Sequence, residues 1–314
     1  MSAIFSITFP IYAAIAIGYV LVARGVFVRD DMLVLGRYVL NIAMPALLFH
    51  ALASRPLGQI ADVGYMTAYL LGGVAVMGLG FVWFSLTAAD KGRRAVAVMG
   101  VSCPNSGYVG YPVMLLVIPD QAGVILALNM LVELVVLIPL SLILLDLSQE
   151  RERVSPWVRA RRIAVDLLKR PLMIALILGL AASALDLPVP GTVEKLFQML
   201  ASSAAALALV VIGGSLVGLP LNGNRSMAVQ IAVGKLVVHP ALAAAAVVLV
   251  SALAPGALSE PMGRVAILSA AMPIMGIYPV LAQERGLGGA ASLALLVATT
   301  AAFGTLSLAL VWLG

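Results

Sequence analysis

Two short segments combine proline, glycine and polar side chains in a pattern that could build a binding site. The first reads CPNSGYVGYPVML from Cys103, and the second reads MPIMGIYPVLA from Met272. Both follow the order Pro-x-x-Gly, a short gap and Tyr-Pro-Val, although the gaps differ by two residues. Proline inside a helix removes a backbone donor and clashes with the carbonyl four residues earlier. Because freed backbone groups in lipid need protein or a water-filled cavity around them, the segments predict broken helices at a polar pocket.

The residues around the two breaks form the predicted substrate-binding site. We expect Asn105 to be central, because its amide directly follows the first break and can donate a hydrogen bond to an anion. Helices that begin after each break would present free N–H groups and partial positive charge, which also favours an anion. The complete predicted set is Ser102, Pro104, Asn105, Ser106, Gly107, Pro273, Gly276 and Tyr278.

Three ionisable residues inside apolar runs are candidates for ion coupling. A carboxylate such as Glu133 is costly in a membrane, so it either serves a function, such as carrying a proton, or bonds to a neighbouring helix. Lys235 and His239 are four residues apart and therefore share one helix face. Lys235 could pair with Glu133, attract an anion or extend its ammonium to the cytoplasmic interface. The sequence leaves functional and structural roles open for all three residues.

The composition of the chain requires a lipid environment for these segments. Of 314 residues, 62% are hydrophobic and 11% are charged, and the mean hydropathy is +1.11. Soluble domains carry about 25% charged residues. Ten apolar runs approach the roughly 20 residues of a membrane span, so we predict an all-α polytopic membrane protein. The runs lie near 4–23, 32–53, 63–88, 95–118, 123–145, 171–186, 194–219, 226–253, 265–283 and 288–313.

The distribution of lysine and arginine predicts the orientation in the membrane. One set of alternate connections holds fourteen of these residues and the other set holds three. By the positive-inside rule, the first set is cytoplasmic, which places both termini in the periplasm of a bacterial inner membrane. The run at 4–23 lacks a preceding basic region and a cleavage site, so we expect a retained span and no signal peptide.

The longest connection, 146–170, divides the chain into two groups of five spans, 1–145 and 171–314. The connection is basic and is expected either to form an interfacial helix or to act as a retention loop. Each proline–glycine segment lies in the fourth span of its group. Since five is odd, the two groups enter the membrane in opposite senses. Broken spans at matching positions of inverted repeats are a sequence indicator of a transporter binding site.

Other classes of function have little support in the sequence. The single Cys103 excludes an intramolecular disulfide, and two histidines give no recognisable zinc motif. There is no phosphate-binding Gly-rich loop of the ATPase type and no constellation typical of a membrane enzyme. We therefore expect no enzyme, no cofactor and no metal. The net charge of +5 lies mainly in the connections, which indicates membrane topology and not nucleic-acid binding.

At these residues the sequence resembles the auxin efflux carrier family. The string PNSGYVGYPVML from Pro104 is similar to the Pro-Asn crossover of the family, and MPALLFHAL from Met44 is similar to its Pro-x-x-x-Phe-His segment. The strings RPLMIALILGL from Arg170 and ASSAAALALVVIGGSLVGL from Ala201 resemble the opening of its second half. The plant members have a long loop between the halves, whereas this chain has about 25 residues there, so loop-based regulation is not expected.

The resemblance implies a ten-span fold like that of bile-acid and sodium/proton carriers. Spans 1, 2, 6 and 7 would form a scaffold domain, and spans 3–5 and 8–10 a transport domain that moves in an elevator-like manner. The crossover prolines map onto Pro104 and Pro273, and the substrate-contacting asparagine maps onto Asn105. The expected substrate is a small organic anion, such as the dicarboxylates malate or malonate. A homodimer through the scaffold, proton or sodium coupling with another solute, and a channel or sensor on the same fold remain alternatives.

Overall fold

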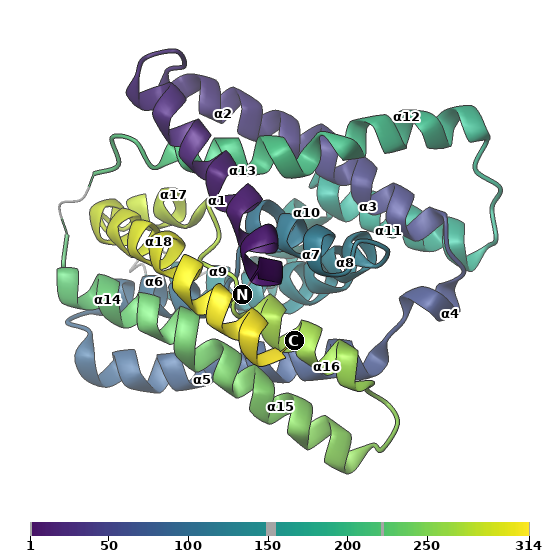
Figure 1. The fold of residues 1–314 in the computed structure, drawn as a ribbon. Helices are drawn as coiled ribbons and strands as arrows, with labels where there is room; N and C mark the ends of the chain where they lie inside the picture. Colours follow the sequence, from purple (N-terminus) through teal and green to yellow (C-terminus); the bar gives the residue numbers. More distant parts are fainter. Residues whose placement is uncertain (1, 149–154, 221–222, 314) are drawn as a thin grey trace. The chain divides into compact units, whose positions relative to one another are not determined.

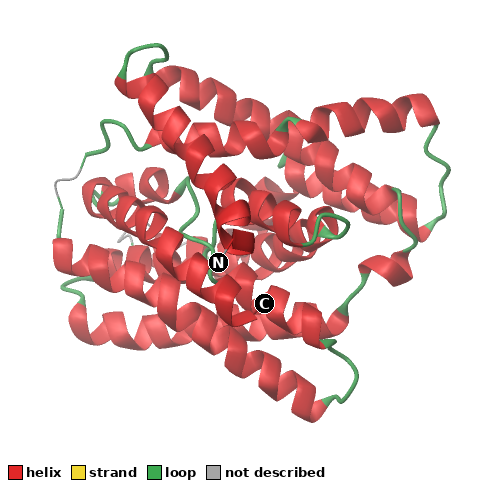
Figure 2. Ribbon diagram, viewed as in Figure 1, coloured by secondary structure: helices red, strands yellow, loops and turns green. Residues whose placement is uncertain are grey.

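The computed structural model describes residues 2–148, 155–220 and 223–313, and every regular element in these ranges is a helix (Figures 1 and 2). Residues 149–154 of the predicted linker lie outside this description. Six helices are long and apolar enough to cross a membrane, namely Arg29–Ala53, Val63–Thr87, Ala122–Leu147, Gly191–Ser215, Arg225–Leu253 and Gly288–Trp312. Shorter apolar helices cover Thr8–Ala23, Ser106–Val117 and Pro171–Ala184. The all-α class is therefore confirmed, and the count of ten spans stays a prediction.

The chain forms two compact units whose segments alternate along the sequence. Unit 1 contains Met1–Asp62, Ser106–Leu131 and Asp166–Gly218. Unit 2 contains Val63–Asn105, Val132–Val165 and Leu219–Gly314. Each unit therefore draws on both halves of the sequence.

Unit 1 is built from pairs of helices that join early and late segments of the sequence. Its α1 packs on α13 and its α3 packs on α11 and α12. Glycine allows the first pair to approach closely, because a Cβ at Gly18 would overlap the carbonyl of Val210, and one at Gly213 would overlap that of Ile15. The elements are α1 (Ser2–Ala23), α2 (Arg29–Tyr38), η1 (Val39–Ala43), α3 (Met44–Ala53), α4 (Leu57–Ile60), η2 (Ser106–Gly110), α7 (Tyr111–Val117), α8 (Ala122–Val132), α11 (Pro171–Ala184), α12 (Gly191–Ser202) and α13 (Ala204–Ser215).

Unit 2 is centred on the long helix α5, which packs on α6, α15 and α16. Gly72 of α5 faces the backbone of Ala243, where an added Cβ would lie 2.8 Å from Cα. α18 packs on α14 and α17. The elements are α5 (Val63–Thr87), α6 (Lys91–Ser102), η3 (Glu133–Leu137), α9 (Ile138–Leu147), α10 (Pro156–Leu168), α14 (Arg225–Val233), η4 (Gly234–Val238), α15 (His239–Leu253), α16 (Glu260–Ala270), α17 (Tyr278–Gln283) and α18 (Gly288–Leu313).

Four π-helical turns share one cause in the sequence. Each turn is followed, after one intervening residue, by a proline near the start of the next α-helix. The proline ring would clash with the carbonyl four residues earlier, and in each case that carbonyl belongs to the middle of the π-turn, where the wider winding relieves the clash. The turns are η1, η2, η3 and η4, and the prolines are Pro45, Pro112, Pro139 and Pro240.

Large apolar side chains remain exposed along several of the long helices. Leu86 is 81% exposed, Leu253 is 77% exposed and Trp312 is 73% exposed. Apolar surface in water is unfavourable by about 25 cal/mol for each Å². These helix faces are therefore suited to contact with lipid, which agrees with the composition.

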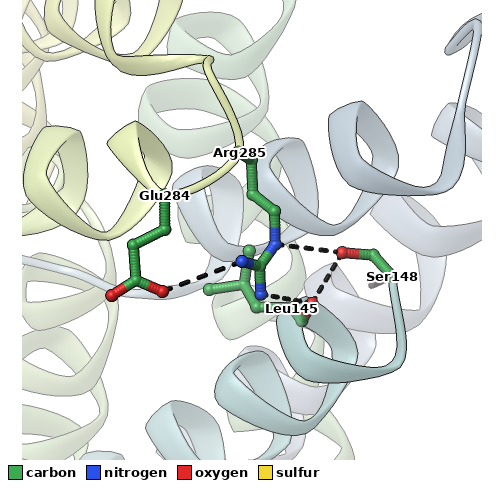
Figure 3. A network of polar contacts seen from close by, with 4 residues as sticks. All are labelled: Leu145, Ser148, Glu284 and Arg285. Atoms are coloured by element: carbon green, nitrogen blue, oxygen red, sulfur yellow. Dashed lines mark hydrogen bonds and ion pairs between the residues drawn. The ribbon is translucent and has the colours of Figure 1, made fainter. Parts of the chain in front are cut away.

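An arginine joins the ends of α17 and α9 within unit 2 (Figure 3). Arg285, in the turn after α17, donates from Nη2 to the carbonyl of Leu145 at 2.6 Å and from Nε to Ser148 Oγ at 3.3 Å. Its Nη1 forms an ion pair with Glu284 at 3.7 Å. The guanidinium thereby satisfies carbonyl and hydroxyl groups at the C-terminal end of α9.

Candidate functional site

The two breaks pair with each other through their backbones, at Cys103–Asn105 and Pro273–Met275 of unit 2. α6 ends at Ser102 and α16 ends at Ala270, and the chain beyond each helix is extended around Pro104 and Ile274, which form an antiparallel bridge. The N–H of Asn105 donates to the carbonyl of Pro273 at 2.8 Å, and the N–H of Met275 donates to the carbonyl of Cys103 at 3.1 Å. Backbone groups freed by one break are thus satisfied by the other, which makes both breaks tolerable in an apolar interior.

The side chain of Asn105 lies beside the backbone of the second break. The residue is 5% exposed. Apart from its chain neighbours, a Cβ added at Gly276 would meet only the Nδ2 atom of Asn105, at 4.0 Å, among the described residues. Glycine at this position therefore leaves open space next to the amide, as a site for a small ligand requires.

Two hydroxyl groups of the predicted set differ in how they are used. Ser102 Oγ donates to the carbonyl of Val98 at 2.8 Å, which ties this serine to its own helix. Tyr278 is completely buried, and its hydroxyl has no hydrogen-bond partner among the described residues. Gly100 makes room for that hydroxyl, because an added Cβ would lie 2.8 Å from it. The hydroxyl of Tyr278 can therefore still form a hydrogen bond, whereas the hydroxyl of Ser102 already donates to the carbonyl of Val98.

Two predicted residues fall in unit 1 and not with the other six. Ser106 and Gly107 open the π-turn η2 and are both buried. A Cβ at Gly107 would lie 2.9 Å from the sulfur of Met44, so this glycine is needed for packing within unit 1. The structure brings Ser102, Pro104, Asn105, Pro273, Gly276 and Tyr278 together in unit 2.

Lys235 belongs to η4, and its side chain reaches the C-terminal end of α16, where the second break begins. The residue has no exposed surface, and its Nζ donates to the carbonyl of Ala270 at 2.7 Å. The same Nζ is 2.9 Å from Nδ1 of His239, one turn later on the same face, as the spacing predicts. The other ring nitrogen of His239, Nε2, is buried, and no residue in the described part of the chain forms a hydrogen bond with it. The ammonium is therefore held inside the protein and does not extend to the interface.

Glu133 is held by a tyrosine of α5. Its Oε1 accepts a hydrogen bond of 2.7 Å from the hydroxyl of Tyr69, and the residue is 2% exposed. The hydrogen bonds of the Lys235 ammonium go to the carbonyl of Ala270 and to His239. The sequence suggested a direct pair as one role of Lys235, and the structure instead places each group with its own partners in the same unit.

Nearly the whole chain matches one family of membrane transport proteins. The family described as "Membrane transport protein" matches residues 3–312. The chain belongs to this family. It is the auxin efflux carrier family that the crossover motifs indicated, so that resemblance is confirmed, and the protein is a multi-pass membrane transporter.

Two proteins that are similar to this chain have names that describe them as transporters. A protein of Rhizobium meliloti (strain 1021) named "Putative malonate transporter" is 25% identical over 309 residues, which cover 96% of this chain and 92% of the relative. An "Uncharacterized transporter" of Methanothermobacter thermautotrophicus is 29% identical over 100 residues, which cover 32% of this chain and 33% of the relative.

Two tyrosines of α5 form polar contacts near the second break that the sequence did not predict. Tyr65 and Tyr69 are stacked, with ring centroids 6.1 Å apart, and the hydroxyl of Tyr65 lies 2.9 Å from Ser269 Oγ near the end of α16. Their spacing of four residues was the available signal, because it places two hydroxyl groups on one helix face. Tyrosine is common in membrane proteins, so this spacing alone does not single out a site.

Proposed function

We propose that the chain is a secondary carrier for a small organic anion and that the substrate binds at the paired breaks of unit 2. The observation that carries this proposal is the antiparallel pairing of Cys103–Asn105 with Pro273–Met275. It leaves the Asn105 amide buried beside the open Gly276 backbone. Irregular backbone inside an apolar protein that also presents an amide donor is a typical arrangement of a transporter binding site.

The proposed substrate class is a mono- or dicarboxylate such as malate or malonate. The Asn105 amide can donate to a carboxylate oxygen, and Tyr278 has an unused hydroxyl. The name of the Rhizobium meliloti relative refers to malonate, and that relative aligns over 96% of this chain. Both observations support a short carboxylate over a cation or a sugar.

The proposed mechanism is elevator-type alternating access in a bacterial inner membrane with both termini in the periplasm. In this proposal ten spans form two inverted repeats of five, with a scaffold of spans 1, 2, 6 and 7 and a transport domain of spans 3–5 and 8–10. The two compact units support this division in part, because spans 1, 2, 6 and 7 lie in unit 1 and spans 3 and 8–10 in unit 2, whereas spans 4 and 5 are divided between the units. Unit 2 contains Pro104, Pro273 and the three coupling candidates Glu133, Lys235 and His239, which supports its role as the transport domain.

Counterflow in proteoliposomes tests the function directly. Vesicles that contain the purified protein and unlabelled malonate should accumulate labelled malonate transiently, with saturation at high concentration. Vesicles without protein, and vesicles loaded with a sugar, serve as controls. Non-saturable flux would indicate a channel, and failure of every short carboxylate to exchange would contradict the proposed substrate class.

Proton coupling at Glu133 is a separate part of the proposal. If Glu133 carries the coupled proton, Glu133→Gln should retain exchange of substrate and lose accumulation driven by a pH gradient, because the amide cannot release a proton. Uptake driven by the gradient at the wild-type level in this variant would reject the role of Glu133 and leave the carrier function intact.

A further inference from the structure

The helix α10, in the connection between the two halves of the chain, is too short and too charged to cross a membrane. Its 13 residues, Pro156–Leu168, are about 20 Å long, whereas a span needs roughly 20 residues. Arg161 and Arg162 lie near its middle, and both are exposed. The helix therefore lies either in water or along the surface of the membrane.

The C-terminal end of α10 is kept near the membrane by the helix that follows it. Only Lys169 and Arg170 separate Leu168 from the start of α11. Three steps between consecutive Cα atoms cover at most about 11 Å. α11 is an apolar helix whose Leu178 is 54% exposed, so it has a face for lipid. Because the two helices are so closely joined, α10 ends at the membrane surface.

One stripe of α10 combines exposed apolar side chains with an arginine. Its members are Trp157, Arg161, Val165 and Leu168, which follow one another at intervals of four, four and three residues. All four side chains are exposed, Trp157 to 76% and Leu168 to 52%. Tryptophan is enriched at the interface between membrane and water, where its ring contacts the ends of the acyl chains. The stripe is therefore suited to the level of the lipid headgroups.

Arg161 is surrounded on its helix by apolar residues. The residues three and four positions away are Trp157, Val158, Ala164 and Val165. A guanidinium in such a stripe can keep its charge solvated at the headgroups while the apolar neighbours reach toward the acyl chains. Its planar donors match the oxygens of a phosphate group. The composition of the stripe thus favours a phospholipid as the partner of Arg161.

The charge of this segment is opposite to that of an anionic membrane surface. Residues 155–170 contain five basic residues and one acid, Asp166. Asp166 is four residues after Arg162 and lies beside it on the helix, away from Arg161. The positive-inside rule predicts that the connection is cytoplasmic, and that leaflet carries anionic lipids. Charge and apolar exposure therefore indicate the same partner.

We propose that α10 is a docking site for the anionic surface of the membrane. The side chains of Trp157, Val165 and Leu168 lie at the boundary of the acyl chains, and the guanidinium of Arg161 donates paired hydrogen bonds to a lipid phosphate. The ligand is a phospholipid with net negative charge in the surrounding bilayer. The proposal does not depend on the substrate or on the carrier mechanism.

The environment of Trp157 provides the first test. The chain has three tryptophans, so Trp83→Phe combined with Trp312→Phe leaves Trp157 as the single one. In nanodiscs that contain phosphatidylglycerol, its emission should be shifted to the blue, quenched by lipids brominated on the acyl chains, and protected from aqueous iodide. Trp83, 52% exposed on the long apolar helix α5, is the positive control when it is retained alone. Emission typical of water, with quenching by iodide and none by brominated lipid, would overturn the proposal and leave this face to a soluble partner.

The second test measures which lipid the helix selects. Quenching of Trp157 by brominated phosphatidylglycerol is compared with quenching by brominated phosphatidylcholine. The protein should prefer phosphatidylglycerol, and the preference should decrease at high salt. Arg161→Gln should reduce the preference about fivefold, the contribution of one basic residue near an anionic surface, without changing the melting temperature, because Arg161 is exposed.

Arg264→Gln, at an exposed arginine of α16, is the matched control and should keep the preference. Arg161→Lys retains the charge and should keep most of it. Equal quenching by the two lipids before the substitution, or an unchanged preference in Arg161→Gln, would overturn the proposal.

Discussion

Two basic side chains of unit 2 bind the last carbonyls of a helix, and their surroundings differ. Lys235 donates to Ala270 at the end of α16, which we term the buried cap, and Arg285 donates to Leu145 at the end of α9, which we term the peripheral cap. Lys235 has no exposed surface. The side chain of Arg285 is 9% exposed, and its ion-pair partner Glu284 is 72% exposed.

The difference lies in what can replace each cation. At the peripheral cap, the carbonyl of Leu145 also accepts a hydrogen bond from Ser148 Oγ at 2.6 Å, so it keeps a donor when the arginine is lost. Lys235 has no exposed surface, so loss of its ammonium leaves the carbonyl of Ala270 without its charged donor. We therefore expect Arg285 to contribute to stability alone, and Lys235 to be needed for transport as well.

The largest effect should come from removing the charge of the buried cap. Lys235→Met should lower the free energy of unfolding by about 3 kcal/mol, because a buried carbonyl loses its charged donor. Unfolding in detergent with increasing denaturant measures this change. The double variant Lys235→Met with Glu133→Gln should regain part of the loss, since both charges are then absent. Additive losses in the double variant would show that the two charges do not interact.

Asn105→Ala should abolish transport and leave the folded protein intact. The hydrogen bonds that pair the two breaks join backbone atoms, whereas an anion at Gly276 would lose the amide donor. Exchange of labelled malonate and the melting temperature are the two measurements. Asn105→Asp should be equally inactive, because a carboxylate repels an anionic substrate. Asn129→Ala, at a buried asparagine of α8, is the control and should keep transport. Wild-type exchange by Asn105→Ala would contradict the site.

The two tyrosines of α5 differ in their hydrogen-bond partners. Tyr69 bonds to the carboxylate of Glu133, and Tyr65 bonds to the hydroxyl of Ser269. Tyr69→Phe should lower the free energy of unfolding by about 2 kcal/mol, because the hydrogen bond to Glu133 is lost. Tyr65→Phe removes a bond to the hydroxyl of Ser269 and should have an effect of about 1 kcal/mol. Both residues are buried on the same helix, so each is the control for the other. Equal losses would indicate that Glu133 does not carry a negative charge in the resting protein.

The breaks and the helix composition could be predicted from the sequence because each has a local cause. Pro104 and Pro273 cannot continue a helix, and apolar runs of span length have no other stable environment. The positions of Lys235 and His239 on one face also followed from their spacing. These features depend on residues near each other in the chain.

The partners across the fold could not be predicted in the same way. The ammonium of Lys235 binds Ala270, which is 35 residues later in the chain, through a backbone carbonyl that any residue type would provide. Glu133 binds Tyr69, 64 residues earlier. The sequence also did not indicate that the chain passes from one compact unit to the other after Asn105. Only the tertiary arrangement supplies this information.

The smallest effect should come from the peripheral cap. Arg285→Gln should lower the free energy of unfolding by about 1 kcal/mol, because the glutamine amide can still donate one hydrogen bond and Ser148 Oγ still donates to the carbonyl of Leu145. Transport should stay within about twofold of the wild type, since a loss of this size leaves the folded population nearly unchanged. Thermal unfolding and counterflow, run beside Lys235→Met, measure both quantities. A loss of transport in Arg285→Gln without loss of stability would remove the distinction between the two caps, and it would assign the turn after α17 a role in the transport cycle.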